Sequence, residues 1–320
     1  MKRCLFLLFS LLAVLPSCRR SGDYVQLSGY AQGGVYAVKY NTDGVRVPRE
    51  AVAATVDSLL VKIDRTLSGY NKASVLSRYN AGEEVGPDAM FDEVRARARA
   101  YREETGGALD CAAAPLFDVW GFGFTEDSAP DAAAVAAALE RTRAEEKWNF
   151  NAIAQGYSCD IVAEYLRSIG VKDMLVDIGE IFCQGKNPSG KPWTIGVDRP
   201  EDGNMTPGAD LQAVFHASGA PQGIVTSGNY RKFYVRDGRK YAHTVDPRTG
   251  SPVEHNLLSA TIVAPTAMDA DAYATYCMVI GLAEAQAFIL SRPDLEGYLI
   301  YDEDGVMKSW NSPGFEIVTY

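Results

Sequence analysis

The sequence predicts an α+β fold with mostly antiparallel strands and packed helices. Strand patterns arrive in runs instead of alternating one by one with helices, which disfavours a doubly wound parallel sheet. The chain has 320 residues, of which 47% are hydrophobic and 22% charged, a composition typical of a folded globular protein. No internal repeat and no clear interdomain linker divides it. We therefore expect one domain over residues 29–320.

The N-terminus is typical of a secretory signal peptide. Two basic residues precede an apolar run, Leu5–Leu15, which is too short for a membrane span. The following Pro16-Ser17-Cys18 resembles the lipobox of bacterial lipoproteins, although an ordinary cleaved signal with a stray Cys is the alternative. We expect a signal peptide over residues 1–17 and a tether over 18–28 that begins at a lipidated Cys18. The protein would then be exported and lipid-anchored to a membrane, on the periplasmic side.

Helical patterns dominate the first half of the domain. A first strand is expected over Val35–Tyr40. Apolar residues then recur at helical spacing over Pro48–Leu67, and the missing N–H of the leading Pro costs little at a helix start. A second helix is predicted over Pro87–Glu104, which stops at Gly106-Gly107, and a short Ala-rich helix over Asp131–Arg143.

Strands dominate after the third long helix. This helix is predicted over Ala152–Ile169, where apolar residues stand four apart, and Gly170 is a suitable stop. Two further helices are expected over Met268–Ile280 and Ala283–Leu290. The predicted strands are Asp173–Ile178, Trp193–Val197, Ala213–Ala217, Gly223–Thr226, Lys232–Arg236, Leu258–Val263, Tyr298–Tyr301 and Val306–Trp310.

Charge and cysteine content disfavour several classes of partner. Removal of residues 1–17 takes two of the 31 basic residues and none of the 41 acidic ones, which leaves a net charge of −12. Binding to nucleic acid or to anionic lipid is thereby disfavoured. The four cysteines after Cys18 are far apart and form no CxxC pair, so neither a zinc site nor a disulfide framework is indicated. We expect them to be buried small hydrophobic residues: Cys111, Cys159, Cys183 and Cys277.

The segment YAHTVDPRTGSP, residues 241–252, is where we expect the chemistry. Its Asp, Pro and Gly suit a surface turn for backbone reasons alone. A turn does not need His243, the second of only three histidines in the chain. His243 is therefore a candidate functional residue.

A second candidate site lies on the helix predicted over Met268–Ile280. Asp271 and Thr275 stand four residues apart, so a carboxylate and a hydroxyl project from one helix face. Hard oxygen ligands of this kind suit Mg²⁺. The alternative is that Asp269 or Asp271 caps the helix and that Thr275 merely bonds the backbone.

Three further segments have both a structural and a functional interpretation. The Ser-Gly-Asn turn after Thr226 can hold a phosphate oxygen or simply connect two strands. The glycine-rich, aromatic segment Gly106–Gly123 can accommodate a flat heterocycle or form a buried loop around Trp120; it lacks the Walker and Rossmann spacings. The helix start in Asn149–Asp160 offers free N–H groups to an anion and a carbonyl to a cation.

These pieces resemble the ApbE family, periplasmic lipoproteins that act as FAD:protein FMN transferases. The resemblance runs from Gln32 to Thr275, most of the mature chain. It rests on eight segments in the family's order: AQGGVY, SGYNKASVLSRYN, GALDCAAAPLFDVWGFG, NAIAQGY, LVDIGEI, VTSGNY, HTVDPRTGSP and DAYAT.

The resemblance implies roles for individual residues. The metal site would consist of the Ala152 carbonyl with the side chains of Asp271 and Thr275. His243 would be the general base, since an imidazole pKa of ~6.5 suits that role, with Asp246 orienting or assisting it. The residues that would bind FAD are Gln32, Tyr70, Ala108, Leu109, Asp110, Gln155, Thr226, Ser227, Gly228, Tyr230, His243, Asp246 and Thr249.

The chain also departs from the family's pattern. It has Gln32-Gly33-Gly34 where Met-Gly-Thr is common, Gln155 where many members have Lys, and Asn229 in place of a frequent Asp. A hydroxyl and charges are thereby lost near the flavin or the phosphates. We expect these changes to affect substrate affinity and rate more than the fold or the metal site.

The implied reaction is a phosphoryl transfer. FMN would move from FAD to a Thr hydroxyl of an acceptor protein, with release of AMP, and Mg²⁺ would neutralise the diphosphate. An acidic chain in particular needs a cation to bind an anionic dinucleotide. The acceptor would be a membrane redox subunit of the Rnf or Nqr type, and the lipid anchor would hold the enzyme near it.

Other functions remain open at this point. Water could attack in place of the acceptor hydroxyl, which would make the protein an Mg²⁺-dependent FAD diphosphatase that releases FMN and AMP. The protein could also be a non-catalytic lipoprotein that binds flavin, as Gln155 and Gly34 suggest. A lipoprotein that binds carbohydrate or peptide is a third alternative.

Overall fold

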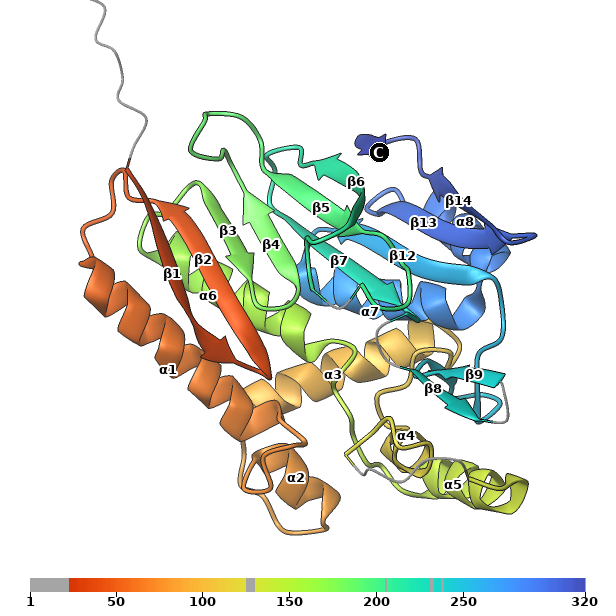
Figure 1. Ribbon diagram of the computed structural model, residues 1–320. Coiled ribbons are helices and arrows are strands. Elements are labelled where there is room, and N and C mark those ends of the chain that lie inside the picture. The colour runs from red at the N-terminus through yellow and green to blue at the C-terminus, as the bar shows by residue number, and fades with distance from the viewer. Residues whose placement is uncertain (1–22, 125–129, 205, 231–232, 237–238, 320) are drawn as a thin grey trace, which may run out of the picture.

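An eight-stranded antiparallel sheet forms the centre of the molecule (Figure 1). The computed structural model describes residues 23–319, apart from 125–129, 205, 231–232 and 237–238. In sheet order, the strands are β1 (Tyr24–Ala31), β2 (Gly34–Asn41), β3 (Met174–Asp177), β4 (Ile181–Gln184), β7 (Gln222–Gly228), β12 (Leu257–Ala264), β13 (Glu296–Glu303) and β14 (Val306–Asn311).

Helices cover one face of this sheet and a smaller sheet covers the other (Figure 1). The helical layer consists of α1 (Arg49–Leu67), α2 (Val75–Asn80), α3 (Ala89–Glu104), α6 (Ala154–Ser168), α7 (Ala267–Ile280) and α8 (Leu282–Ser291). The smaller sheet has the order β15 (Ile317–Thr319), β6 (Leu211–His216) and β5 (Thr194–Asp198). Separate hydrophobic clusters fill the two interlayer spaces, so the molecule has three layers.

Helix α7 is the central helix of its layer. It contacts β7, β12 and α6, and ten of its fourteen residues are buried. Apolar residues surround it on all sides, as expected for a helix enclosed by protein. A carboxylate on such a helix, as at Asp271, is therefore placed in the interior.

A small lobe lies beside the C-terminal half of the main sheet. It contains α4 (Ala114–Val119), α5 (Ala132–Ala144), the hairpin of β10 (Val245–Asp246) with β11 (Ser251–Pro252), and the hairpin of β8 (Phe233–Arg236) with β9 (Arg239–Ala242). The lobe has its own small core around Leu116, Trp120 and Val245. The Trp120 indole N–H donates to the Gly250 carbonyl over 2.8 Å, which ties α4 to the turn of the β10–β11 hairpin.

The predicted α+β class and the antiparallel sheet are confirmed, and the predicted helices occur with ends shifted by a few residues. The tether prediction was too long, because residues 24–28 belong to β1 and pair with β2 from Tyr24↔Asn41 onward. As an edge strand, β1 buries only Leu27, so it has little apolar alternation to detect. The short elements α2, α4, β4, β9, β10, β11 and β15 were not predicted.

Some predictions lie outside the described residues. These are the signal peptide, Cys18, the start of the tether, and the first residue of the strand expected at Lys232–Arg236. Over the range that the structure does describe, none of the helices combines the length and apolarity needed to span a bilayer. The four remaining cysteines are buried free thiols, which confirms their prediction as small hydrophobic residues.

Candidate active site

A cavity of about 580 Å³ lies between the small lobe and helix α7. A smaller depression, of about 370 Å³, lies between α5 and the β10–β11 turn. Many residues predicted to bind FAD or metal line the larger cavity together, although they are distant in sequence. These are Tyr70, Ala108, Leu109, Asp110, Ala152, Ser227, His243 and Thr275.

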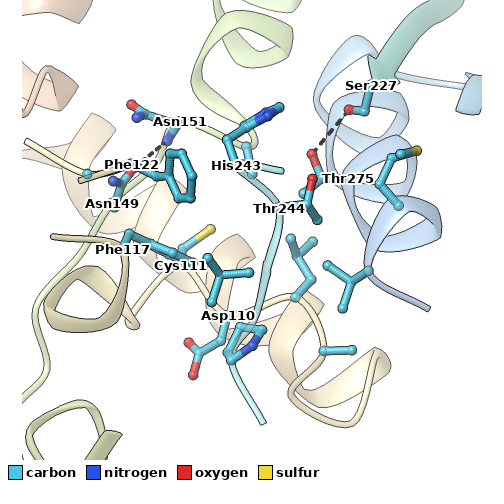
Figure 2. A pocket seen from close by; sticks show the side chains of 18 of the residues that line it. Asp110, Cys111, Phe117, Phe122, Asn149, Asn151, Ser227, His243, Thr244 and Thr275 are labelled. Carbon is cyan, nitrogen blue, oxygen red and sulfur yellow. Dashed lines mark hydrogen bonds between the residues drawn. The ribbon is translucent and has the colours of Figure 1, made fainter. Parts of the chain in front are cut away.

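The two ends of the cavity differ in chemistry (Figure 2). Phe117 and Phe122 lie at one end near Asn149 and Asn151, and the hydroxyls of Ser227, Thr244 and Thr275 lie at the other. Flat apolar walls suit an aromatic ring system, whereas hydroxyls suit an anionic or metal-bound group. The cavity therefore fits an elongated ligand with one aromatic end and one polar end.

The glycine-rich segment supplies the aromatic end. Phe117 and Phe122 line the cavity, whereas Trp120 is buried in the lobe. The buried-loop interpretation is thus confirmed for Trp120, whereas binding of a flat heterocycle by the segment Gly106–Gly123 stays a prediction. Tyr70 stands at the rim with 65% of its surface exposed, and its ring meets the ring of Phe124 edge-on at 5.2 Å.

No Lys or Arg lines the cavity within the described part of the chain. The one carboxylate in its wall is Asp110, whose pKa is raised by burial against the lowering effects of the Ala112 N–H and of Arg102. The Arg102 guanidinium approaches Asp110 from outside, with 3.2 Å between Nε and Oδ2. A phosphate in this cavity would therefore meet no Lys or Arg side chain among the described residues.

His243 enters the cavity just before the β10–β11 hairpin. It is half-buried, and its ring meets the ring of Phe122 edge-on, with 6.3 Å between centroids. The hairpin turn closes through N–H donation from Thr249 and Gly250 to the Asp246 carbonyl. Gly250 has φ of 80°, the left-handed conformation that favours glycine.

The partner of Asp246 differs from the one expected. Its carboxylate accepts from the Arg248 backbone N–H over 2.9 Å and from the Arg248 guanidinium, with 2.9 Å between Nη2 and Oδ2. In this arrangement Asp246 stabilises the turn that follows His243. A direct catalytic role for Asp246 stays a prediction, and the ion pair gives no support for its orienting the imidazole.

The capping alternative for Asp271 is wrong. Thr266 is the N-cap of α7, and its Oγ1 accepts from the Asp269 N–H over 3.0 Å. The Asp269 carboxylate accepts from the Tyr101 hydroxyl over 2.6 Å and forms an ion pair with Arg97. Asp271 lies two residues further along α7 and does not cap this helix.

Asp271 is a buried carboxylate without a cationic partner among the described residues. It is 4% exposed, and its Oδ2 accepts from the Gly156 N–H over 3.1 Å. Burial raises the pKa of Asp271 to about 7, and the nearby Asp160 adds to the rise. Thr275, one turn later, places its Oγ1 3.4 Å from the Ser227 Oγ and lines the cavity. Asp271 is thus a buried carboxylate next to a hydroxyl of the cavity wall, and its role as a metal ligand stays a prediction.

The third predicted metal ligand, Ala152, lies close to this helix because of two glycines. A Cβ on Gly156 would stand 2.3 Å from the Ala267 carbonyl oxygen, and one on Gly223 would stand 2.3 Å from the Ala267 Cα. Only glycine lets α6 and β7 approach the start of α7 this closely. The prediction began α6 at Ala152, but the helix starts at Ala154, so Ala152 lies in the preceding turn and faces the cavity.

Other predicted residues lie outside the cavity wall. The Gln32 amide donates to the Ser158 hydroxyl, and the Gln155 amide donates to the Ile178 carbonyl over 3.1 Å. Thr249 borders the smaller depression beside Trp120. The remaining predicted residues that are not part of the wall are Thr226, Gly228, Tyr230, Asp246 and Asp271.

Sequence reasoning missed several residues of the wall, among them Phe122, Asn149 and Thr244. Asn149 is 4% exposed, and its Oδ1 accepts from the Asn151 N–H over 2.9 Å, which shapes the turn before α6. A signal existed for Phe122 and Asn149, since both fall in segments selected for possible ligand binding. For Thr244, the only signal in the sequence was its position next to His243.

Comparisons with known proteins identify the family of the chain. The family model described as the ApbE family matches residues 32–299. A protein of Haemophilus influenzae named FAD:protein FMN transferase is 31% identical over 95% of this chain and 94% of its own, and one of Klebsiella pneumoniae with the same name is 34% identical over 83% and 81%.

Solved structures show the same fold. The flavin transferase ApbE from Vibrio cholerae superposes with a TM-score of 0.78 at 29% identity, covering 91% of this chain and 97% of that one. The apo form of the Pseudomonas stutzeri flavinyl transferase ApbE gives a TM-score of 0.77 at 29% identity, with 91% and 95% covered. The family match over residues 32–299 and the relatives that span nearly the whole chain show that this protein belongs to the ApbE family.

Proposed function

We propose that this protein is an Mg²⁺-dependent FAD:protein FMN transferase that moves FMN from FAD to a Thr hydroxyl of an acceptor protein and releases AMP. The observation that best supports this proposal is the shape of the cavity. It has aromatic walls at Phe117 and Phe122 and a hydroxyl-rich end at Ser227 and Thr275. FAD has the matching form, a flat isoalloxazine connected to a diphosphate. The names of the relatives support the same activity.

The residues present fit a hard divalent cation. Asp271, Thr275 and the Ala152 carbonyl would supply oxygen atoms, which Mg²⁺ prefers. A carboxylate that is fully buried without a cationic partner is costly to ionise, and a bound cation offsets that cost. The described residues contain no cluster of three or more His, Cys, Asp or Glu, in keeping with a site that uses one carboxylate. When bound, Mg²⁺ would neutralise diphosphate charge, and no Lys or Arg among the described residues of the wall offers that charge.

His243 is the proposed general base. It lies in the cavity wall between the aromatic end and the hydroxyl end (Figure 2). The acceptor Thr hydroxyl would attack the phosphorus of the FMN half and pass its proton to the His243 imidazole. The bond from that phosphorus to the bridging oxygen would break, and AMP would leave with the oxygen. The imidazole ring meets the Phe122 ring edge-on.

The proposed acceptor is a membrane redox subunit of the Rnf or Nqr type. Support comes from the family resemblance and from the lipobox-like Pro16-Ser17-Cys18. A lipid on Cys18 would anchor the enzyme to the membrane on the periplasmic side and confine it near such an acceptor. Labelling of cells with a radioactive fatty acid tests the anchor, which requires label on the parent chain and none on Cys18→Ser.

An assay with purified components tests the activity. The protein is incubated with FAD and Mg²⁺, with and without the acceptor, and AMP, free FMN and protein-bound flavin are measured. We expect AMP to form together with protein-bound flavin, and neither to form in EDTA. Rapid release of free FMN with no labelled acceptor would instead indicate a diphosphatase. FAD binding without AMP release would indicate a non-catalytic flavin carrier.

A further inference from the structure

Thr244 has an unused hydroxyl in the wall of the active-site cavity. The residue is 8% exposed and lines the cavity. Its backbone is fixed, because the Thr244 carbonyl accepts from the Val253 N–H over 3.0 Å. Its Oγ1 makes no hydrogen bond to any residue in the described part of the chain. The side chain is thus more than nine-tenths buried, yet its polar atom has no protein partner.

This hydroxyl lies at the polar end of the cavity. Figure 2 shows Thr244 on the side of Thr275 and Ser227, away from Asn149, with its hydroxyl directed toward that of Thr275. The three side chains come from separate segments: Thr244 directly precedes β10, Ser227 lies on β7 and Thr275 on α7. Three hydroxyls therefore converge on a region where no described Lys or Arg reaches the wall.

The Thr244 hydroxyl belongs to the cavity wall and bonds no described protein group, so it is available to donate a hydrogen bond to a ligand in the cavity. Phosphoryl oxygens are strong acceptors, and a hydrogen bond to a charged acceptor is worth more than one between neutral groups. Carbon packing does not require the oxygen, because Val would fill the same volume. The hydroxyl is therefore better explained by a ligand than by the fold.

We propose that Thr244 binds the diphosphate of the substrate, with its Oγ1–H donating to a phosphoryl oxygen. The inference rests on the proposed function, since it assumes that the diphosphate occupies the hydroxyl end. It adds a neutral donor on the side of the phosphates that faces the hairpin, beyond Ser227 and the proposed metal ligands. Because no described Lys or Arg lines the cavity, such donors would bind the anion together with the metal.

Three substitutions separate the hydroxyl from the methyl group. Thr244→Val keeps the volume and removes the hydroxyl, Thr244→Ser keeps the hydroxyl and removes the methyl, and Thr244→Ala removes both. The dissociation constant for FAD is measured by flavin fluorescence with Mg²⁺ present, and unfolding temperatures are recorded in parallel. We expect Val and Ala to weaken FAD binding about tenfold and Ser to stay within about twofold of the parent.

The opposite pattern would overturn the inference. If Ser weakens binding while Val does not, the residue acts through packing, and equal affinity in all variants shows that the hydroxyl is not used. Thr55→Val is the matched control, because it removes a hydroxyl from the exposed face of α1, where Thr55 Oγ1 bonds only the Ala51 carbonyl. If the parent protein does not bind FAD, the proposed function itself is contradicted. If the parent binds FAD and Thr244→Val binds it equally well, only the role of Thr244 is contradicted.

Discussion

Replacement of Gly156 by Ala tests whether the close contact of α6 with α7 determines the geometry of the site. A Cβ at this position would lie 2.3 Å from the Ala267 oxygen, 2.6 Å from its carbonyl carbon and 2.8 Å from the Met268 Cα. Real Cβ atoms essentially never come closer than 3.0 Å to such atoms, so the backbones must separate by about 0.7 Å. All three neighbours are backbone atoms, which cannot rotate away as a side chain would.

The separation has two measurable effects. Overpacking of this kind costs about 1–3 kcal/mol of stability, although Ala in an open helix position would stabilise by about 1 kcal/mol relative to Gly. The same shift moves Ala152 away from Asp271 and Thr275, and a displacement near 1 Å lowers catalysis by roughly 100-fold. We expect urea unfolding to show the loss of stability and AMP release to show the loss of rate at temperatures where the variant is still folded.

Gly86→Ala is the control, because a Cβ there meets no atom within 4 Å. It should leave both stability and rate near those of the parent. If Gly156→Ala also has parental stability and rate, the contact between α6 and α7 does not set the site. If Gly156→Ala is less stable but its folded fraction releases AMP at the parental rate, the contact between α6 and α7 matters for stability alone. That result would contradict the predicted loss of rate.

Three further predictions concern charge and proton transfer. Asp271→Asn keeps an acceptor for the Gly156 N–H but should lower Mg²⁺-dependent AMP release by at least about 100-fold; an unchanged Mg²⁺ titration would exclude Asp271 as a ligand. His243→Asn should lower the rate at saturating FAD by about 10²–10⁴ with FAD affinity nearly unchanged; the reverse pattern would make His243 a binding residue. Burial raises the pKa of both Asp160 and Asp271 to about 7, so in EDTA the folded chain holds protons that the unfolded chain loses near pH 4. The free energy of unfolding should therefore fall as pH rises from about 4 to 7, and a rise in urea melts over that range would contradict the assignment.

Regular elements with strong periodicity were predictable from sequence. The spacing of Asp271 and Thr275 placed both on one helix face, and α7 has that geometry. The segments around Ser227 and His243 could be selected because glycine, histidine and hydroxyl residues follow apolar strands there. Their convergence on one cavity, however, came from the family resemblance, since no local pattern states which turns meet.

Side-chain direction in turns could not be predicted in the same way. Thr249 and His243 belong to one twelve-residue segment, yet His243 faces the cavity and Thr249 faces the depression beside α5. The Trp120 bond to the Gly250 carbonyl fixes this orientation, and its donor is 130 residues away in sequence. Asp246 is a similar case, because its nearest cation, Arg248, is a residue of the turn itself.

Loss of characteristic residues was also hard to interpret from sequence alone. Gln155 was expected to replace a charged residue of the family pattern, but its amide donates to the Ile178 carbonyl and lies against Gly179, where a Cβ would be 2.4 Å from the Gln155 Nε2. The Gln32 amide donates to the hydroxyl of Ser158, which lies on α6, the helix that also contains Gln155. Both amides thus have structural partners outside the cavity wall, which explains how the fold tolerates the changes.

The most direct test of the proposed function is the mass of an acceptor protein co-expressed with this chain. If the chain transfers FMN, the acceptor gains the mass of one FMN less water on a Thr, and the gain disappears with Asp271→Asn or His243→Asn. An unmodified acceptor in cells where the parent chain converts FAD to free FMN and AMP would contradict the transferase.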